Sequence, residues 1–348
     1  MKIAIDAMGG DFAPHKIVEG AVLFAQEDNT PLVLVGQKDK IEIELKKYSA
    51  CSSISIQHAS DVIEMEESPS KASRSKQDSS LVVATKLLAH KEVDALVSAG
   101  NSGAVMTCAL RYLGRLPGIY RPTIATLIPT LNGHCVVADV GANADCKPEY
   151  LLQFAIMAKL AAQNILNIQK PRVGLLSIGE EKEKGNHLTK HTYPLLEACK
   201  EINFIGNVEG RDIPKGKADV FVCDGFVGNI VLKTVEGTAD VITRMIRQEI
   251  AASGMAKFGY LFMKPALRKF KKKMDYAEYG GAPLLGVNGI CIISHGKSTG
   301  KAIKNAIKVA KRFAAGKVNE EITREIMSLP AHLTPYSELG LQEKPIHS

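Results

Sequence analysis

Glycine-containing turns with polar side chains recur along this chain, and each follows a short apolar run. Glycine lets the backbone turn tightly, and exposed amide groups at the start of a helix attract anions. The turns lie at residues 4–14, 98–104, 139–143, 175–185, 224–229 and 294–301. One such turn proves little, because a tight turn followed by a helix cap gives the same pattern. Six of them together predict a shared anion-binding cleft.

Fingerprints of other sites do not match these turns. No two glycines are separated by one residue, so the dinucleotide motif GxGxxG is absent, and Cys291 stands where a P-loop needs its first glycine. No serine lies in GxSxG, so Ser102 is better explained as an anion donor than as a nucleophile. His187 and His191 lie four apart without HExxH or an obvious third ligand, which favours surface histidines over a metal site.

The elements that must position the turns follow from hydrophobic patterning. Short β-branched runs alternate with helical patterns, which indicates an α/β fold with a buried, largely parallel sheet. In such sheets ligands bind at the carboxyl ends of the strands, where the turns lie. The expected strands are residues 2–6, 32–35, 53–57, 95–98, 124–128, 135–139, 173–177, 203–206, 219–223 and 289–293.

Three other segments have distinct patterns. Residues 64–80 are polar and charge-rich, which predicts a long surface loop. Residues 151–162 predict an amphipathic helix. Residues 226–252 predict one long amphipathic helix, which either projects from the body or makes a dimer contact. No clean boundary between two domains is visible.

Composition limits the class of protein. The 348 residues are 45% hydrophobic and 23% charged, which is enough for a large core, and the net charge of +7 suits an acidic or anionic partner. The N-terminus does not resemble a signal peptide, and no stretch approaches the roughly 20 apolar residues of a membrane span, so we expect a cytoplasmic protein. The seven scattered cysteines predict reduced, mostly buried thiols.

In order along the chain, the turns resemble those of the PlsX family of phosphate acyltransferases, which make acyl phosphate from acyl carrier protein thioesters. The resemblance extends from the start of the chain to about residue 315 and is colinear. Ser102 and Val227 depart from it, because threonine is expected there in many relatives. The matching segments are IDAMGGDFAP (5–14), SPSKASRSKQDSS (68–80), SAGNSGA (98–104), DVGAN (139–143), GEEKEKG (179–185), NFIGNVEGRD (203–212), DGFVGNIVLKTVEG (224–237), YGGAPLLG (279–286) and HGKS (295–298).

The resemblance implies a fold and an assembly. The fold is a three-layer α/β/α arrangement like that of isocitrate and isopropylmalate dehydrogenases and of phosphate acetyltransferases. Two intertwined subdomains share one large mixed sheet, and the protein forms a homodimer. We therefore expect a single catalytic unit at residues 1–330, amphipathic helices at 226–275 that project from it, and a C-terminal tail at 331–348.

The resemblance also implies a reaction, in which a long-chain acyl group passes from acyl carrier protein to inorganic phosphate at the start of phospholipid synthesis. Phosphate can itself be the nucleophile, so neither a metal nor another cofactor is expected. We hypothesise neutral donors near the phosphate at Gly9, Gly10, Asn101, Ser102 and Asn143. The hypothesised catalytic residues, which supply cationic or amide groups, are Lys184, Asn229, Lys233 and His295. Carboxylates hypothesised to orient these groups are Asp6, Asp139, Glu180 and Asp224, and the alternative for each is a helix cap or a salt bridge.

Residues 254–274 combine apolar and basic side chains without an acidic residue. Such a segment can lie in an anionic membrane surface, where the product would be close to the next, membrane-bound acyltransferase. The alternatives are a dimer core with solvated lysines, or a docking site for the acidic carrier protein. A nucleic-acid partner is not expected. The hypothesised membrane contacts are Phe258, Leu261, Phe262, Lys264, Arg268 and Lys269.

Three other functions remain open at this point. A phosphate acetyltransferase that uses coenzyme A thioesters would need nearly the same site. A membrane-docked scaffold that binds the carrier protein without turnover would not need so many intact polar turns. A dehydrogenase survives only through kinship of fold, because neither a nucleotide fingerprint nor a metal-binding carboxylate cluster is visible.

Overall fold

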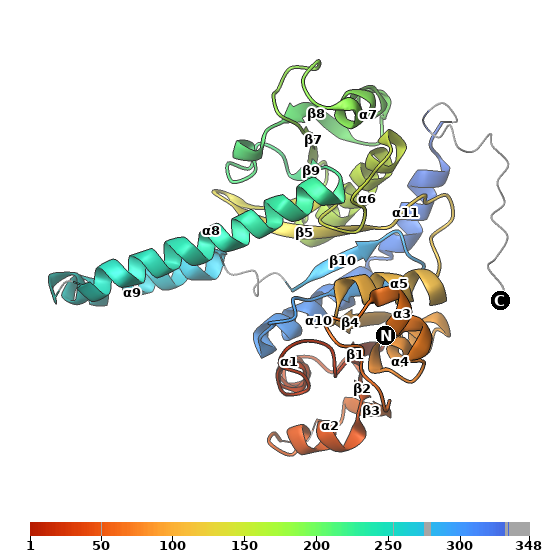
Figure 1. Ribbon diagram of the computed structural model, residues 1–348, viewed down its shortest axis with the longest axis vertical. Helices are drawn as coiled ribbons and strands as arrows, with labels where there is room; N and C mark the ends of the chain where they lie inside the picture. The colour runs from red at the N-terminus through yellow and green to blue at the C-terminus, as the bar shows by residue number, and fades with distance from the viewer. Residues whose placement is uncertain (50, 253, 275–279, 331–332, 334–348) are drawn as a thin grey trace.

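One mixed sheet forms the centre of the molecule in the computed structural model, which describes residues 1–49, 51–252, 254–274, 280–330 and 333, with only the backbone at 257, 261 and 268–274. Within the described residues the sheet has eleven strands in the order β3-β2-β1-β4-β11-β10-β5-β6-β9-β7-β8 (Figure 1). The strands are β1 (Ile3–Asp6), β2 (Leu32–Gly36), β3 (Ile54–His58), β4 (Ala95–Ser98), β5 (Thr123–Thr130), β6 (Gly133–Ala138), β7 (Arg172–Leu176), β8 (Asn203–Val208), β9 (Val220–Val222), β10 (Ala282–Leu285) and β11 (Ile290–Ile293).

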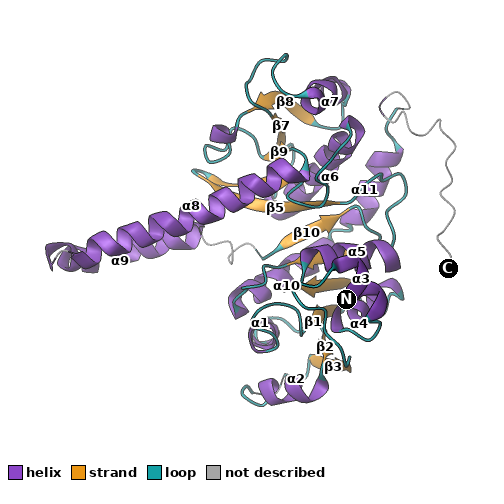
Figure 2. Cartoon of the chain, in the orientation of Figure 1, coloured by secondary structure: helices purple, strands orange, loops and turns teal. Residues whose placement is uncertain are grey.

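Antiparallel pairing occurs only in the middle of this described sheet, between β11 and β10, β10 and β5, and β5 and β6. The outer pairings are parallel, so a parallel half lies on each side of an antiparallel centre (Figure 2). This architecture confirms the expected α/β class with a large mixed sheet.

Helices cover both faces of the sheet, because alternate strand residues point to opposite sides. Ala4 packs with α4 and α5, whereas Ile3 and Ile5 pack with α1 and α10. Residues of β6, β7 and β9 pack with α6 and α11. The helices are α1 (His15–Ala25), α2 (Lys38–Leu45), α3 (Pro69–Ser75), α4 (Ser80–Ala89), α5 (Ser102–Tyr112), α6 (Pro148–Leu166), α7 (His187–Ala198), α8 (Gly225–Ala252), α9 (Gly254–Met274), α10 (Gly300–Ala315) and α11 (Val318–Met327), with a 3₁₀ turn at Gly210–Asp212.

Helix α10 shows how sequence positions an element near the cleft. Its buried residues recur at helical spacing and face the sheet, while its lysines remain on the other side. Three of these lysines bind the turn after α1: Lys304 and Lys308 pair with Glu27, and Lys311 pairs with Asp28. These ion pairs join α10 to α1 beside the N-terminal half of the sheet.

All ten expected strands are present, but three sequence-based expectations need correction. Residues 64–80 are not only loop, because Pro69 begins α3 and its Ala72 and Ser73 are buried. The helix at 151–162 is buried on every side rather than amphipathic. Its polar Gln153 can be buried because its side-chain amide bonds the backbone of Gly118 and Tyr120. Strand β10 is missing from the prediction because Pro283, which cannot donate to a ladder, is unexpected in an inner strand.

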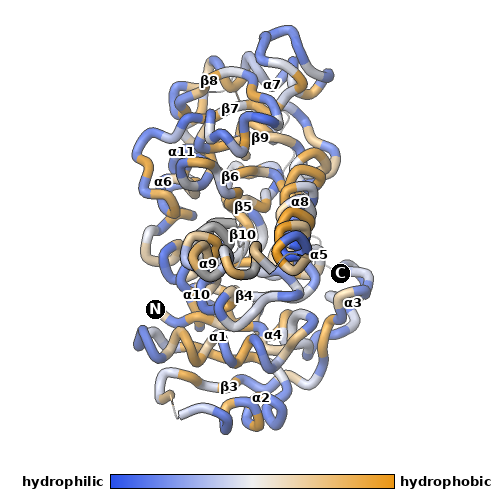
Figure 3. Tube along the Cα trace, turned by 90° about the vertical axis from the view of Figure 1, so that its left-hand side faces the viewer, coloured by the Kyte–Doolittle hydropathy of each residue, from blue (hydrophilic) through white to orange (hydrophobic). Residues whose placement is uncertain are grey.

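The long helix expected at 226–252 is α8, which lies beside α9, and the two project from the body (Figure 1). In the view along this pair, much of the trace of α8 has the orange colour of hydrophobic residues (Figure 3). Among the described residues, none of the helices has both the length and the apolar character that a membrane crossing requires. Of the expected tail at 331–348, the structure describes only Leu333, which is buried.

Candidate functional site

A cleft of about 410 Å³ opens at the antiparallel centre of the sheet, between its two parallel halves. Its walls come from β5, the turn after β6, the first turns of α8, the start of β10 and the segment from β11 into α10. The cleft-lining residues used below are Ser102, Gly141, Phe226, Asn229, Leu232, Lys233, Glu236, Ser294, His295 and Ser298. The cleft thus combines hydroxyl, amide and charged side chains with an apolar wall.

Asp6, at the end of β1, holds the first glycine turn together. Its carboxylate accepts hydrogen bonds from Ser80 Oγ at 2.6 Å and Ser98 Oγ at 2.7 Å. Burial raises the pKa of Asp6, although these hydroxyl bonds act in the opposite direction. A β-carbon on Gly9 would collide with this carboxylate and lie 2.8 Å from the backbone nitrogen of Gly100. Asp6 and Gly9 therefore position the turns and do not line the cleft.

Gly10 continues the same turn with a φ of 103°, a conformation that favours glycine. The next residue, Asp11, donates its backbone N–H to the carbonyl oxygen of Gly296 at 2.8 Å. The first turn and the turn before α10 are therefore packed against each other. This contact brings the glycine turns of residues 4–14 and 294–301 together, as the sequence predicts.

Asp139, directly after β6, has the same role in the other half of the sheet. Its carboxylate accepts bonds from the backbone N–H groups of Ile124, Ala142 and Asn143, and from Asn143 Nδ2. Asn143 Nδ2 also donates to the carbonyl oxygen of Pro122. Burial raises the pKa of Asp139 despite the bonds from Asn143. The Asn143 amide, a hypothesised phosphate donor, is therefore used within the fold.

The start of α8 is docked on the Asp139 turn. Gly225 donates its N–H to the carbonyl oxygen of Asn143, and a β-carbon on Gly228 would collide with the carbonyl oxygen of Asp139. Asp224 caps the helix by accepting the Val227 N–H at 2.8 Å and does not line the cleft. This close approach explains why Asn229, one residue after Gly228, reaches the cleft.

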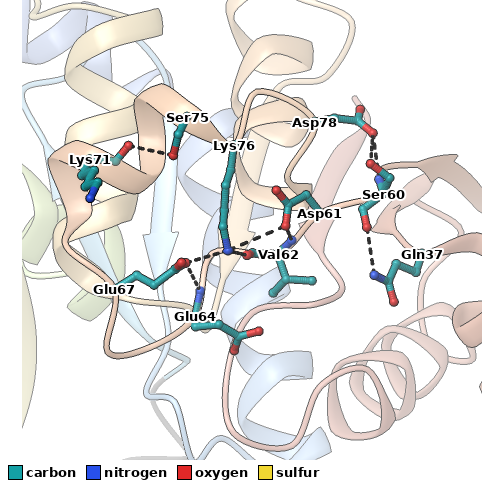
Figure 4. Close-up of polar contacts among 10 residues, drawn as sticks. All are labelled: Gln37, Ser60, Asp61, Val62, Glu64, Glu67, Lys71, Ser75, Lys76 and Asp78. Carbon is teal, nitrogen blue, oxygen red and sulfur yellow. Dashed lines mark hydrogen bonds and ion pairs between the residues drawn. The ribbon is translucent and has the colours of Figure 1, made fainter.

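Asn101 is also occupied by the fold. Its Oδ1 caps α5 by accepting the Ala104 N–H, and its Nδ2 donates to the carbonyl oxygens of Met65 and Glu67. Lys76 holds this loop: its Nζ binds Glu67 at 2.9 Å and the carbonyl oxygen of Val62 at 2.6 Å (Figure 4). Asn101 therefore anchors the loop beside Ser102, whereas Ser102 itself faces the cleft.

Lys233 and Asn229 lie four residues apart on α8, a spacing that predicts a shared helix face, and both line the cleft. Lys233 Nζ pairs with Glu236 at 2.9 Å, and Glu236 is itself part of the cleft lining. His295, from the turn after β11, lies in the opposite wall, and its Nδ1 is 3.1 Å from the Lys297 backbone nitrogen. The cleft therefore contains a lysine and a histidine from different elements.

The loop after β7 is separate from this cleft. Ser177 Oγ donates to the carbonyl oxygen of Lys184, and Glu180 forms a 2.8 Å ion pair with Lys217. Neither Lys184 nor Glu180 lines the cleft. The structure thus brings together Ser102, Asn229, Lys233 and His295 from the hypothesised set.

Sequence reasoning missed several cleft residues. Ser294 and Ser298 lie in the predicted turn at 294–301, but only His295 of that turn is among the hypothesised site residues. Glu236 and Phe226 lie on α8, where they resemble ordinary helix surface positions until the sheet is assembled. The helical spacing could have identified Phe226 and Glu236, because each lies three residues from Asn229 or Lys233 and therefore on the same face of the helix.

The cysteine thiols and the possible metal ligands are the remaining groups that could do chemistry. Burial raises the pKa of Cys108, Cys135, Cys146, Cys199 and Cys291 to about 12. All seven cysteines are free, and five are buried, as the sequence predicts. Among the described residues, no three histidine, cysteine or carboxylate side chains gather in a way that would hold a metal ion.

The hypothesised membrane residues lie on α9. Phe258 and Phe262 are 65% and 75% exposed, and their rings meet edge to face with centroids 5.5 Å apart. Lys264 is exposed as well. The side chains of Leu261, Arg268 and Lys269 lie outside the described residues. The described part of α9 therefore exposes both apolar and basic groups.

The overall fold is that of phosphotransacylases. A phosphotransacetylase from Streptococcus pyogenes matches with a TM-score of 0.61 and 17% identity, covering 90% of this chain and 94% of that one. A branched-chain phosphotransacylase from Enterococcus faecalis V583 matches with a TM-score of 0.55 and 15% identity, covering 90% of this chain and 99% of that one. At these identities the similarity establishes the fold alone.

Sequence relatives define the family. The model of the fatty acid synthesis protein family matches residues 1–321. A phosphate acyltransferase from Desulfitobacterium hafniense (strain DSM 10664 / DCB-2) is 54% identical, covering 94% of this chain and 98% of the relative. One from Geobacter sulfurreducens is 50% identical, covering 94% of each chain. The chain belongs to this family, which is the PlsX family that its turns resemble, and it is an acyltransferase.

Proposed function

We propose that this acyltransferase moves a long-chain fatty acyl group from acyl carrier protein to inorganic phosphate, giving acyl phosphate for phosphatidic acid and phospholipid synthesis. The relatives' name supports phosphate as the acceptor. The observation that carries the proposal is the cleft, where Ser102, Lys233 and His295 face one space beside the apolar Phe226 and Leu232. Polar groups would hold the phosphate and thioester carbonyl, and the apolar wall would receive the start of the acyl chain.

In the proposed reaction a phosphate oxygen attacks the thioester carbonyl carbon. A carbon–oxygen bond forms, the carbonyl becomes a tetrahedral oxyanion, and its collapse breaks the carbon–sulfur bond. The thiolate leaves and takes a proton from His295 or Lys233, and the products are acyl phosphate and the free carrier thiol. Positioned donors would stabilise the oxyanion, and losing one such donor typically costs about 3 kcal/mol of transition-state stabilisation. No cofactor is needed for this sequence of steps.

The projecting helices support a second part of the proposal, which is peripheral attachment of a cytoplasmic homodimer to the membrane. Phe258 and Phe262 on α9, and Ile242, Met245 and Ile246 on α8, are exposed apolar side chains. Covering them with a second protomer, with anionic lipid, or with both would remove this surface from water. Lipid contact would leave the product beside the membrane acyltransferase that consumes it.

A phosphotransacetylase-like activity on coenzyme A thioesters is the second candidate, because the phosphotransacylase fold favours it. The two candidates share the cleft chemistry and differ in the acyl donor.

The test mixes purified protein with acyl carrier protein that bears a long-chain acyl thioester, with and without inorganic phosphate. Free carrier thiol and acyl phosphate are measured together, and equal, phosphate-dependent formation of both is expected. Activity only with an acyl coenzyme A would replace the proposed donor. Thiol release without phosphate would contradict the proposed acceptor.

For the membrane proposal, Phe262→Glu should reduce sedimentation with anionic liposomes at low salt. Met327→Glu is a matched control, because Met327 is 64% exposed on α11, away from the projecting pair. Equal sedimentation of the wild type and Phe262→Glu would contradict lipid contact at α9.

A further inference from the structure

Two serines in the wall of the cleft remain without a role. Ser294 directly follows β11, and Ser298 immediately precedes Thr299, the cap of α10. Their exposed fractions are only 4% and 3%, yet both line the cleft. Ser294 Oγ is buried and has no hydrogen-bond partner among the residues that the structure describes. A buried hydroxyl without a partner is costly, so this position calls for an explanation.

The start of α10 gives Ser294 and Ser298 an electrostatic setting. Thr299 caps this sixteen-residue helix by accepting the Ala302 N–H, and Ala302 in the first turn also lines the cleft. The N-terminus of a helix carries a partial positive charge and favours anions. The unpartnered Ser294 hydroxyl is an independent sign that a ligand with hydrogen-bond acceptors belongs here.

Other parts of the cleft fit the same ligand. Ser102, the first residue of α5, brings a second helix N-terminus to the cleft. His295 lies between the two serines in sequence, and Lys233 faces the cleft from α8. By contrast, Asn101 and Asn143 already use their side-chain amides within the fold. The hydroxyls of the α10 entrance therefore replace those two amides as candidate donors.

We infer that Ser294, Ser298 and the first turn of α10 form the subsite that binds the phosphate group of the acceptor. We call Ser294 and Ser298 the serine pair. Identifying its ligand as the attacking phosphate rests on the function proposed above, whereas the binding of a phosphate group does not. A phosphate could also belong to the pantetheine arm of the acyl donor, and kinetics with the two substrates distinguish these sources.

The first experiment compares wild type with Ser294→Ala. The Michaelis constant for inorganic phosphate should rise about 10- to 100-fold, the range expected when one hydrogen bond to a charged group is lost. The Michaelis constant for the acyl donor should stay unchanged. Thermal stability without phosphate should be unchanged or higher, because Ser294 Oγ has no partner to lose among the described residues. This separation of stability from phosphate affinity is not expected of a merely structural serine.

Ser79→Ala is a matched control. Ser79 Oγ is also buried without a partner among the described residues, but Ser79 lies before α4 and does not line the cleft. Its kinetic constants should equal those of the wild type. Ser298→Ala provides a second test of the serine pair if Ser294→Ala folds poorly, and the same rise in the phosphate constant is expected.

A binding measurement keeps this inference separate from the proposed function. Inorganic phosphate should raise the unfolding temperature of the wild type and have a much smaller effect on Ser294→Ala. This comparison applies even if the wild type does not turn over acyl carrier protein. Equal phosphate stabilisation of both proteins, or a change confined to the acyl-donor constant, would overturn the assignment.

Discussion

The buried carboxylates and the cleft wall use their polar groups in opposite ways. Asp6 and Asp139 end strands in the two halves of the sheet, and each accepts several hydrogen bonds from its own turn and neighbouring elements. Ser294 in the cleft wall instead has no partner for its hydroxyl among the described residues. The contrast indicates that the carboxylates position the turns, while the wall supplies the groups that meet substrate. Changes at the two regions should therefore damage different properties.

The largest effect on activity is expected for Lys233→Ala. Removing a positioned donor typically lowers turnover about 100- to 1000-fold, and we expect a loss of that size with an unchanged unfolding temperature. Steady-state kinetics and thermal unfolding measure the two properties. Lys38→Ala is a control, since Lys38 is also an exposed helix lysine paired with a glutamate, at 3.7 Å, but lies on α2. Near-normal activity of Lys233→Ala would remove Lys233 from the catalytic group.

The largest effect on stability is expected for Asp139→Ala. The change leaves the backbone N–H groups of Ile124 and Ala142 without this acceptor, and it disrupts the dock for α8. We expect the free energy of unfolding to fall by about 3 kcal/mol, measured by urea denaturation. Asp145→Ala, at an exposed position a few residues further on, should be nearly neutral. A stable Asp139→Ala variant with selectively lost phosphate affinity would reverse the comparison.

A smaller effect is expected for Glu236→Gln. Glu236 pairs with Lys233 in the cleft and places a negative charge where a phosphate must enter. Removing that charge should lower the Michaelis constant for phosphate by about threefold, of the order expected for a partly exposed ion pair. Asp240→Asn, which affects an ion pair further along α8, is the control. A raised Michaelis constant would mean that Glu236 helps to hold Lys233 in its working position.

The smallest effect concerns acid stability of the contact between α1 and α10. Hydrogen bonds from Lys304 and Lys308 lower the pKa of Glu27 from 4.5 to about 2. A carboxyl with a lowered pKa stabilises the fold above its unfolded pKa and loses that contribution as pH falls through its folded pKa. Glu27→Gln should therefore lose stability less steeply between about pH 4.5 and about pH 2, measured by urea denaturation at several pH values. Glu66→Gln, at an exposed position, should follow the wild-type curve, and identical curves for all three proteins would contradict the expectation.

The sequence predicts the framework well because its signals are local. Apolar runs such as 32–35 and 95–98 are strands, and the long pattern at 226–252 is α8. Glycine turns also indicate the cleft, because carboxyl ends of neighbouring strands meet at one edge. Strand β10 is not predicted, because Pro283 cannot donate a backbone hydrogen bond and therefore argues against an inner strand. Its pairing with β11 and β5 is visible only in the folded sheet.

The roles of individual polar residues are less predictable. Asn101 and Asn143 have the side chains expected of phosphate donors, but long-range contacts to Met65 and Pro122 use their amides. Ser294 has an unremarkable sequence context, and only burial without a described partner distinguishes it. Residue type therefore indicates what a group can do, and the folded contacts decide whether it is available.

The central claim is that phosphate itself attacks the thioester in this cleft, and isotope exchange tests it most directly. Wild-type protein is incubated, without phosphate, with carrier protein that bears a long-chain acyl thioester and with labelled carrier protein that bears a free thiol. Direct attack predicts no label in the acylated carrier, because no acyl group leaves the thioester until phosphate is added. Exchange without phosphate would reveal an acyl-enzyme intermediate and contradict the account.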